Sequence, residues 1–137
     1  MKKQGKLSSI GHSNVSFDTF FNLLQTSDIQ TVIDCRTKPR SRFPQYNQAR
    51  LQSALGDANI AYEFRGESLG GMGINVFQDE TIDELVDRVN NGERIAIMCS
   101  EGDHRKCHRY TMLTPLFENK GIEVEHLSYV RENASTI

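Results

Sequence analysis

Arg94-Ile-Ala-Ile-Met-Cys-Ser-Glu101 is the segment that says most about the architecture of this chain. Arg94–Met98 is an apolar run with two β-branched isoleucines, which is typical of a buried strand. Polar and reactive side chains follow at once, in Cys99-Ser-Glu-Gly-Asp-His-Arg-Lys-Cys-His-Arg109, before a predicted helix. Ligands of open α/β sheets bind where strands end and helices begin. The junction therefore predicts a parallel sheet and a site at its carboxyl edge.

The rest of the chain alternates predicted strands and helices. Further strands are predicted at Lys6–Ile10, Gln30–Cys35, Ile60–Phe64 and Glu123–Leu127. A first helix is predicted after an N-cap at Ser16, and a second at Asn47–Leu55, ended by Gly56. A third is predicted at Thr81–Val89, with a Thr81/Glu84 capping box and a stop at Asn91-Gly92. A fourth is predicted at His108–Asn119, interrupted by Pro115 and ended by Gly121. This order favours a Rossmann-like α/β three-layer sandwich with a mainly parallel sheet of about five strands.

Length and composition limit the class of protein. The 137 residues suit one domain, 1–137. No apolar run approaches the roughly 20 residues of a membrane span, and no apolar segment follows the basic N-terminus as in a signal peptide. Three cysteines are too few for a disulfide framework and fit a reducing compartment. We therefore expect a cytoplasmic protein without membrane contact, and we leave the oligomeric state open.

Positive charge is concentrated although the net charge is −2. Five of the 16 basic residues lie within Arg36–Arg50, a window without any acid, and three more are Arg105, Lys106 and Arg109. Two interpretations are open: a pair of solvated loops, or an anion site built from both windows. The second predicts an anionic small molecule, a nucleotide or a nucleic acid as the partner.

The polar residues collect after the predicted strands. They are His12, Ser13, Asp34, Arg36, Gly70, Gly71 and the segment that begins at Cys99. The carboxyl ends of parallel strands share one edge of a sheet, so these residues are expected to lie together. This convergence is the main argument for an active site.

Four motifs in order resemble a known family. They are Ile10-Gly-His-Ser-Asn14, Val32-Ile-Asp-Cys-Arg36 with Pro39 and Ser41, Leu69-Gly-Gly71, and Cys99-Ser-Glu101 with Cys107-His-Arg109. Together they resemble the family called domain of unknown function 488. The resemblance implies a Rossmann-like domain with a suspected enzymatic role, but no established reaction. The chain departs from the family pattern at Cys35 and His104, and its segment between Gly71 and Arg94 is shorter than in many members.

Cys99 and Glu101 are the first candidates for chemistry. A thiol before a helix N-terminus with basic neighbours has a lowered pKa. With Arg105 it fits the Cys-x5-Arg phosphate cradle, although Glu101 and Asp103 would repel a dianion. Cys99 as a small buried hydrophobe is the alternative. Glu101 fits either a general base or a glycosyl nucleophile. It also fits an acidic residue that complements the helix dipole, and this is the role that we favour for Asp103.

The remaining candidates support these two. His12 fits either an acid–base catalyst or a structural histidine. Asp34 fits either a catalytic carboxylate or the ion-pair partner of Arg36. Substrate binding is predicted for Ser13, Arg36, Ser41, Gly70, Gly71, His108 and Arg109. Cys99, Cys107 and His108 have side chains of the kinds that bind zinc. Neighbouring positions of a helix diverge by about 100°, however, so no metal or cofactor is predicted.

The sequence thus predicts an uncharacterised enzyme, a hydrolase or transferase, with Glu101, Cys99, His12 and Asp34 as catalytic candidates. Its substrate would be phosphorylated, nucleotide-like or a nucleic acid. The reaction class is open between glycosidic-bond cleavage or transfer and phosphoester chemistry. Two alternatives remain open. One is a thiol enzyme that uses Cys99. The other is a non-catalytic nucleotide- or nucleic-acid-binding domain in which Phe43 and Tyr46 stack on bases.

Overall fold

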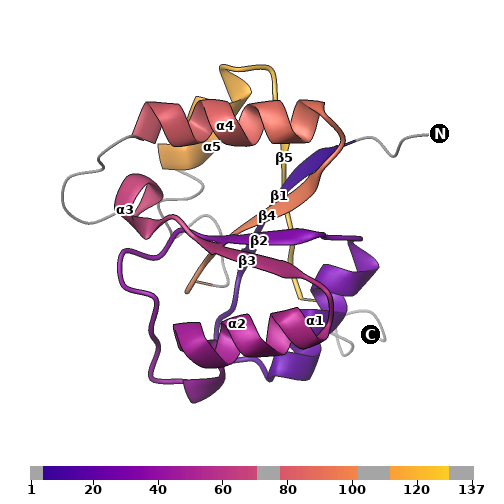
Figure 1. The fold of residues 1–137 in the computed structure, drawn as a ribbon, viewed down its shortest axis with the longest axis vertical. Coiled ribbons are helices and arrows are strands. Elements are labelled where there is room, and N and C mark those ends of the chain that lie inside the picture. The colour runs from indigo at the N-terminus through magenta and orange to yellow at the C-terminus, as the bar shows by residue number, and fades with distance from the viewer. Residues whose placement is uncertain (1–4, 71–77, 102–111, 130–137) are drawn as a thin grey trace, which may run out of the picture.

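The computed structural model describes residues 5–70, 78–101 and 112–129 (Figure 1). Its sheet has five strands in the order β3-β2-β4-β1-β5, and every pairing is parallel. The strands are β1 (Lys6–Gly11), β2 (Thr31–Asp34), β3 (Ala61–Phe64), β4 (Arg94–Cys99) and β5 (Val124–His126). The predicted Rossmann-like α/β architecture is confirmed.

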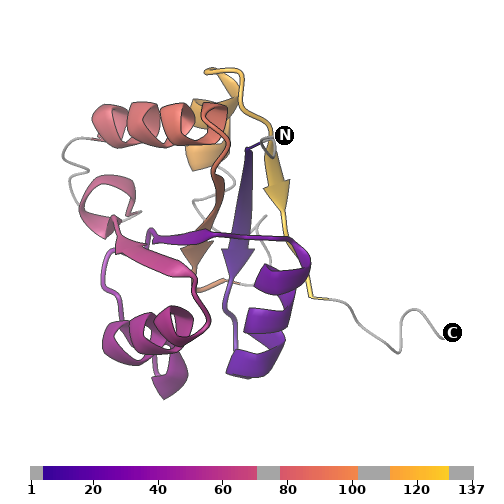
Figure 2. The same ribbon diagram turned by 45° about the vertical axis from the view of Figure 1, so that its right-hand side comes forward.

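Helices cover both faces of the sheet. They are α1 (Phe17–Thr26), α2 (Gln48–Asp57), α3 (Gly66–Leu69), α4 (Gln78–Asn90) and α5 (Thr114–Glu118), with one turn of 3-10 helix, η1 (Pro44–Tyr46). In Figures 1 and 2, α4 and α5 lie above the sheet, and α1 and α2 lie below it. None of the helices in the described ranges is long and apolar enough to cross a membrane.

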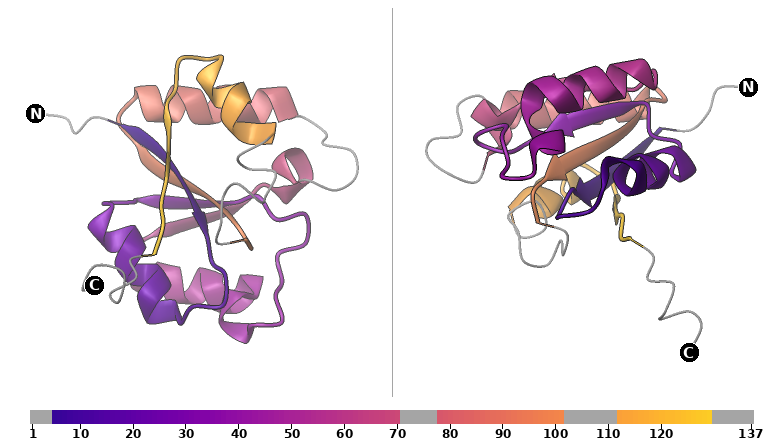
Figure 3. Two further views of the ribbon diagram at one scale, coloured as in Figure 1. Left: turned by 180° about the vertical axis from the view of Figure 1, so that it is seen from behind. Right: turned by 90° about the horizontal axis from the view of Figure 1, so that it is seen from below.

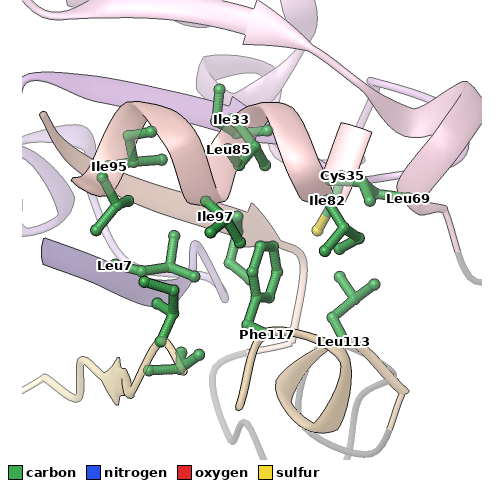
Figure 4. Packing of buried hydrophobic residues seen from close by; sticks show 14 of the residues in the cluster. Leu7, Ile33, Cys35, Leu69, Ile82, Leu85, Ile95, Ile97, Leu113 and Phe117 are labelled. Atoms are coloured by element: carbon green, nitrogen blue, oxygen red, sulfur yellow. The ribbon is translucent and has the colours of Figure 1, made fainter. Parts of the chain in front are cut away.

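The core consists of two apolar clusters, one on each face. Ile95 and Ile97 of β4 belong to the cluster under α4 and α5, whereas Ala96 and Met98 belong to the cluster over α1 and α2. Figure 4 shows the first cluster, where Ile82 and Leu85 of α4 and Phe117 of α5 pack on the strands. Both faces of β4 are therefore buried, which explains its unbroken apolar sequence.

β1 and β4 are neighbours, but the chain leaves them toward opposite faces. Gly11 pairs with Cys99 in the parallel register, so the two strands end side by side. After β1 the chain enters α1 on one face, and β4 is followed by α5 on the other face (Figure 3). Two adjacent parallel strands with such divergent connections leave a crevice beyond their carboxyl ends, where ligands of open α/β sheets bind.

Several local predictions are confirmed. The Ser16 hydroxyl accepts a hydrogen bond from the Thr19 amide at 3.2 Å and caps α1. Gly92 and Gly121 have positive φ angles of 103° and 82°, and they follow α4 and α5. Pro115 lies in the first turn of α5, where its missing N–H costs nothing, and the predicted helical residues 108–111 lie outside the described ranges.

Two predictions of helix ends are wrong. Gly56 does not end α2, which continues to Asp57 and stops before Asn59, a residue with a φ of 62°. Thr81 is not the N-cap of α4, because the helix begins at Gln78. The Thr81 hydroxyl instead donates to Ser68 Oγ at 2.8 Å, a partner that only the tertiary structure supplies.

Candidate functional site

Backbone pairing continues beyond the ends of β1 and β4. The His12 amide donates to the Cys99 carbonyl at 3.0 Å, and the Ser13 amide donates to the Ser100 carbonyl at 2.9 Å. These two bonds hold the segment after β1 against the segment after β4. His12 and Glu101, which are 89 positions apart in the sequence, therefore reach the same edge of the sheet.

A pocket of about 540 Å³ opens at this edge, and we call it the strand-end pocket. Residues from three separate segments line it: His12, Ser13, Asn14, Ser41, Arg42, Phe43, Ser100 and Glu101. The structure thus brings together four predicted site residues, namely His12, Ser13, Ser41 and Glu101. Asn14, Arg42, Phe43 and Ser100 complete the lining.

His12 is the most buried of the polar residues in the pocket lining, with 2% of its surface exposed. Its Nδ1 lies 2.7 Å from the Ser13 carbonyl oxygen, so Nδ1 carries the proton and donates. Burial lowers the pKa of His12 to about 4, and the hydrogen bond to Ser13 only partly opposes this shift. At neutral pH, Nε2 is therefore an acceptor, and it has no hydrogen-bond partner among the described residues.

Ser13 lies in a strained part of the same loop. Its φ of 51° is in the left-handed region, which a residue other than glycine rarely occupies. Such strain costs about 1–3 kcal/mol and clusters at functional sites. The strained turn carries the chain from β1 past the Ser100 carbonyl. It also sets the position of the Ser13 carbonyl, which orients His12.

Arg42 and Phe43 form the aromatic and cationic side of the pocket. The guanidinium carbon of Arg42 lies 5.3 Å from the centroid of the Phe43 ring, a cation–π arrangement. Ser41 holds the segment, because its hydroxyl accepts from the Phe43 amide at 3.0 Å and its amide donates to Asn47 Oδ1 at 2.6 Å. The sequence places Arg42 in the basic window Arg36–Arg50 and makes Phe43 a base-stacking candidate, but it gives no specific signal for Asn14 or Ser100 as pocket residues.

Asp34 and Arg36 bind each other in the interior. Arg36 Nε donates to Asp34 Oδ1 at 2.9 Å and Nη2 to Oδ2 at 2.7 Å, and Nη1 donates to the Tyr46 carbonyl at 2.7 Å. The Tyr62 hydroxyl also donates to Asp34. The geometry agrees with the interpretation that Asp34 orients Arg36. The catalytic role of Asp34 and the anion-binding role of Arg36 stay predictions, because neither side chain lines the strand-end pocket.

Cys99, the last residue of β4, lies on the face of the sheet that α4 and α5 cover. With 4% of its surface exposed, it belongs to the apolar cluster under α4 and α5, together with Cys35. Its Sγ lies 3.7 Å from the Glu101 carbonyl oxygen, and Cys99 is not among the residues that line the strand-end pocket. This environment resembles the buried-hydrophobe interpretation more closely than the nucleophile interpretation.

Of the remaining predicted binding residues, the structure describes only Gly70. Gly70 has an extended backbone, and a Cβ there would lie 2.4 Å from Thr37 Oγ1, so this glycine permits close packing against the loop after β2. Gly71, Cys107, His108 and Arg109 lie outside the described residues. Within the described ranges, no three His, Cys, Asp or Glu side chains lie close enough to hold a metal ion.

Residues 16–73 match the model of a family described as domain of unknown function DUF488. The predicted resemblance is confirmed over this span. The DUF488 match includes Asp34, Arg36, Ser41 and Gly70, but not His12, Cys99 or Glu101. Its description names no reaction or ligand. A search of curated proteins found no match to the chain.

Proposed function

We propose that this protein is an enzyme, a hydrolase or transferase, that acts on a phosphorylated, nucleotide-like or nucleic-acid substrate in the strand-end pocket. One observation carries the proposal. The buried, neutral imidazole of His12 has an Nε2 acceptor without a partner among the described residues, and it lines the same pocket as the Glu101 carboxylate. Buried polar atoms are nearly always satisfied, so an orphaned acceptor in a pocket lining is a candidate contact for substrate or water.

His12 and Glu101 are suited to different tasks. The bond from Nδ1 to the Ser13 carbonyl selects the tautomer in which Nε2 is a buried acceptor. Glu101 is exposed just beyond the end of β4, and a carboxylate there can act as a base or as a nucleophile toward a sugar carbon. The pair supports glycosidic-bond cleavage or transfer better than chemistry that needs a thiolate.

The aromatic and cationic side of the pocket supports the proposed substrate class. The guanidinium of Arg42 offers planar donors for a phosphate, and the Phe43 ring offers a surface on which a base can stack. The pocket volume of about 540 Å³ lies within the usual range for small-molecule sites. A group that carries both a phosphate and a flat ring suits this lining.

A panel of nucleosides, nucleotides and short oligonucleotides tests the proposal, with chromatography to detect released base, sugar or phosphate. Wild type should convert at least one member. Glu101→Gln and His12→Asn should each lower the rate by about 100-fold or more, the usual contribution of acid–base groups. Glu118→Gln is the matched control, since Glu118 is exposed on α5. Circular dichroism should show that each variant is folded.

The outcomes separate the alternatives. An inactive wild type across the panel, or full activity in both His12→Asn and Glu101→Gln, would overturn the proposal. If Cys99→Ala abolishes activity while Glu101→Gln keeps it, the thiol enzyme is the correct function. If wild type binds members of the panel but converts none, the non-catalytic binding domain is the correct function.

A further inference from the structure

The loop before η1 presents three cations to solvent. Lys38, Arg40 and Arg42 are exposed, whereas the residues between them, Pro39 and Ser41, are half-buried. We call residues 37–43 the basic loop. Alternate positions of this one short segment therefore carry a row of three solvent-exposed cations.

Among the described residues, the cations of the basic loop make one charged interaction, the cation–π contact of Arg42 with Phe43. Lys38, Arg40 and Arg42 take part in no ion pair within the described ranges, and the sequence contains no acid between Asp34 and Asp57. The contrast with the arginines of the fold is clear. Arg65 and Arg88 each contact two or more glutamates. The unpaired row is therefore available to an external anion.

The basic loop is held in place before any ligand arrives. The Gln48 amide at the start of α2 donates to the Pro39 carbonyl at 2.9 Å, and the Arg40 amide donates to the Lys38 carbonyl at 2.8 Å. The bond from the Ser41 amide to Asn47 adds a third anchor. A loop ordered in advance loses little conformational entropy on binding.

The row of cations leads into the strand-end pocket. Arg42 lines the pocket beside Phe43, while Lys38 and Arg40 lie earlier in the same loop and do not line it. We propose that the pocket takes one nucleotide of a single-stranded nucleic acid, while the phosphates of neighbouring nucleotides lie along Lys38 and Arg40. This inference rests on the proposed function, since it uses the same pocket.

Two features favour a nucleic acid over another polyanion. The cationic row ends at an aromatic ring in a pocket with polar walls, and stacking on aromatic side chains is how proteins bind unpaired bases. A base that lies against the Phe43 ring must also leave its own stack. A single strand meets this condition at the lowest cost, whereas an acidic peptide or a lipid surface has no base to insert.

The test is fluorescence anisotropy with a labelled oligothymidylate of about 12 nucleotides, measured at several salt concentrations. The variant Lys38→Gln/Arg40→Gln should weaken binding by on the order of tenfold at 0.1 M salt and lower the salt slope by about 1.4, the amount expected for two phosphate contacts on a single strand. Lys6→Gln/Lys120→Gln removes the same charge elsewhere and should leave binding unchanged. Affinity for dTMP, measured by calorimetry, should be equal in wild type and Lys38→Gln/Arg40→Gln.

Each other result would overturn the inference. These results are no binding of the oligonucleotide, equal losses in the two double variants, a parallel loss of dTMP affinity, or equal competition by polyglutamate of the same charge. The two proposals fail separately. Oligonucleotide binding that meets these expectations, with an inactive panel, would remove only the proposed enzymatic function. Turnover of mononucleotides without oligonucleotide binding would remove only the strand inference.

Discussion

The imidazole of His12 lies against the ring of Tyr46, with the ring centroids 4.2 Å apart and the planes inclined by 12°. Tyr46 is fixed at two points, because its hydroxyl donates to the Val15 carbonyl at 2.6 Å and its carbonyl accepts from Arg36. The buried Asp34–Arg36 pair thus positions the ring that covers His12. This chain of contacts keeps the imidazole away from water and therefore neutral.

The buried state of His12 predicts a pH-dependent stability. The unfolded chain protonates this group near its ordinary pKa of 6.5, and the folded chain only near 4, so acid favours unfolding between these values. The contribution of His12 is complete above pH 6.5 and is lost as the pH falls toward 4. Between pH 7 and pH 5 the free energy of unfolding should fall by about 2 kcal/mol for this reason.

Urea unfolding of wild type and His12→Asn at both pH values measures this contribution. The variant should lack this part of the loss at pH 5. The difference between the two pH responses, rather than either stability alone, is the quantity of interest. Identical pH responses in the two proteins would show that His12 titrates normally in the folded state.

Cys99 should behave as a buried thiol. With 4% of its surface exposed and apolar neighbours, it should react slowly with a thiol reagent at neutral pH in the folded protein. Cys99→Ala should keep the activity of wild type and lose about 1 kcal/mol of stability through the missing sulfur. Rapid labelling of Cys99, located by mass spectrometry, would contradict this expectation and favour the thiol enzyme.

Two glycines should respond in opposite ways to alanine. A Cβ on Gly56 would have nothing within 4 Å, and this residue lies in α2, so Gly56→Ala should stabilise the protein by about 1 kcal/mol. A Cβ on Gly66 would lie 1.9 Å from the Arg36 carbonyl oxygen, so Gly66→Ala must shift the backbone after β2 and should cost more than 2 kcal/mol. Thermal or urea unfolding compares the pair directly. Equal changes in stability would show that the loop after β2 can shift without a measurable energetic cost.

Arg88 should stabilise the edge of the sheet that carries β3. Its guanidinium contacts Glu63 at 2.7 Å, Glu84 at 3.2 Å and Glu93 at 2.8 Å. Removing the shared cation leaves three carboxylates close together, so Arg88→Met should cost about 1–3 kcal/mol at pH 7. Lys120→Met, which breaks an exposed pair with Asp83, is the control and should change little.

The same network predicts a second pH response. Hydrogen bonds from Arg88 hold the pKa of Glu63 and of Glu93 below the ordinary value of 4.5, and Arg65 does the same for Glu84. The stabilisation is therefore present above pH 4.5 and is lost as the pH falls through the lowered values. The difference between wild type and Arg88→Met should shrink in that acidic range. A constant difference would mean that Arg88 acts through packing alone.

Local sequence patterns were sufficient for most of the elements. The β-branched and apolar runs predicted each strand to within a few residues, and the Ser16 cap and the glycines after α4 and α5 marked helix ends correctly. Two helix ends are exceptions. Thr81 contacts Ser68 across the fold instead of capping its own helix, and α2 continues past Gly56 to Asp57. The short α3 had no recognisable signal.

The sequence by itself determined that polar residues follow parallel strands and meet at one edge. Only the tertiary structure decided which of them share a pocket, because β1 and β4 are neighbours whose connections diverge. Strand order depends on hydrogen bonds and burial between residues far apart in the chain, and no local pattern encodes them. Asp34 and Arg36 were site candidates of the same standing as His12 and Glu101. In the structure, Asp34 and Arg36 pair with each other in the interior, while His12 lies against Tyr46 and lines a pocket with Glu101.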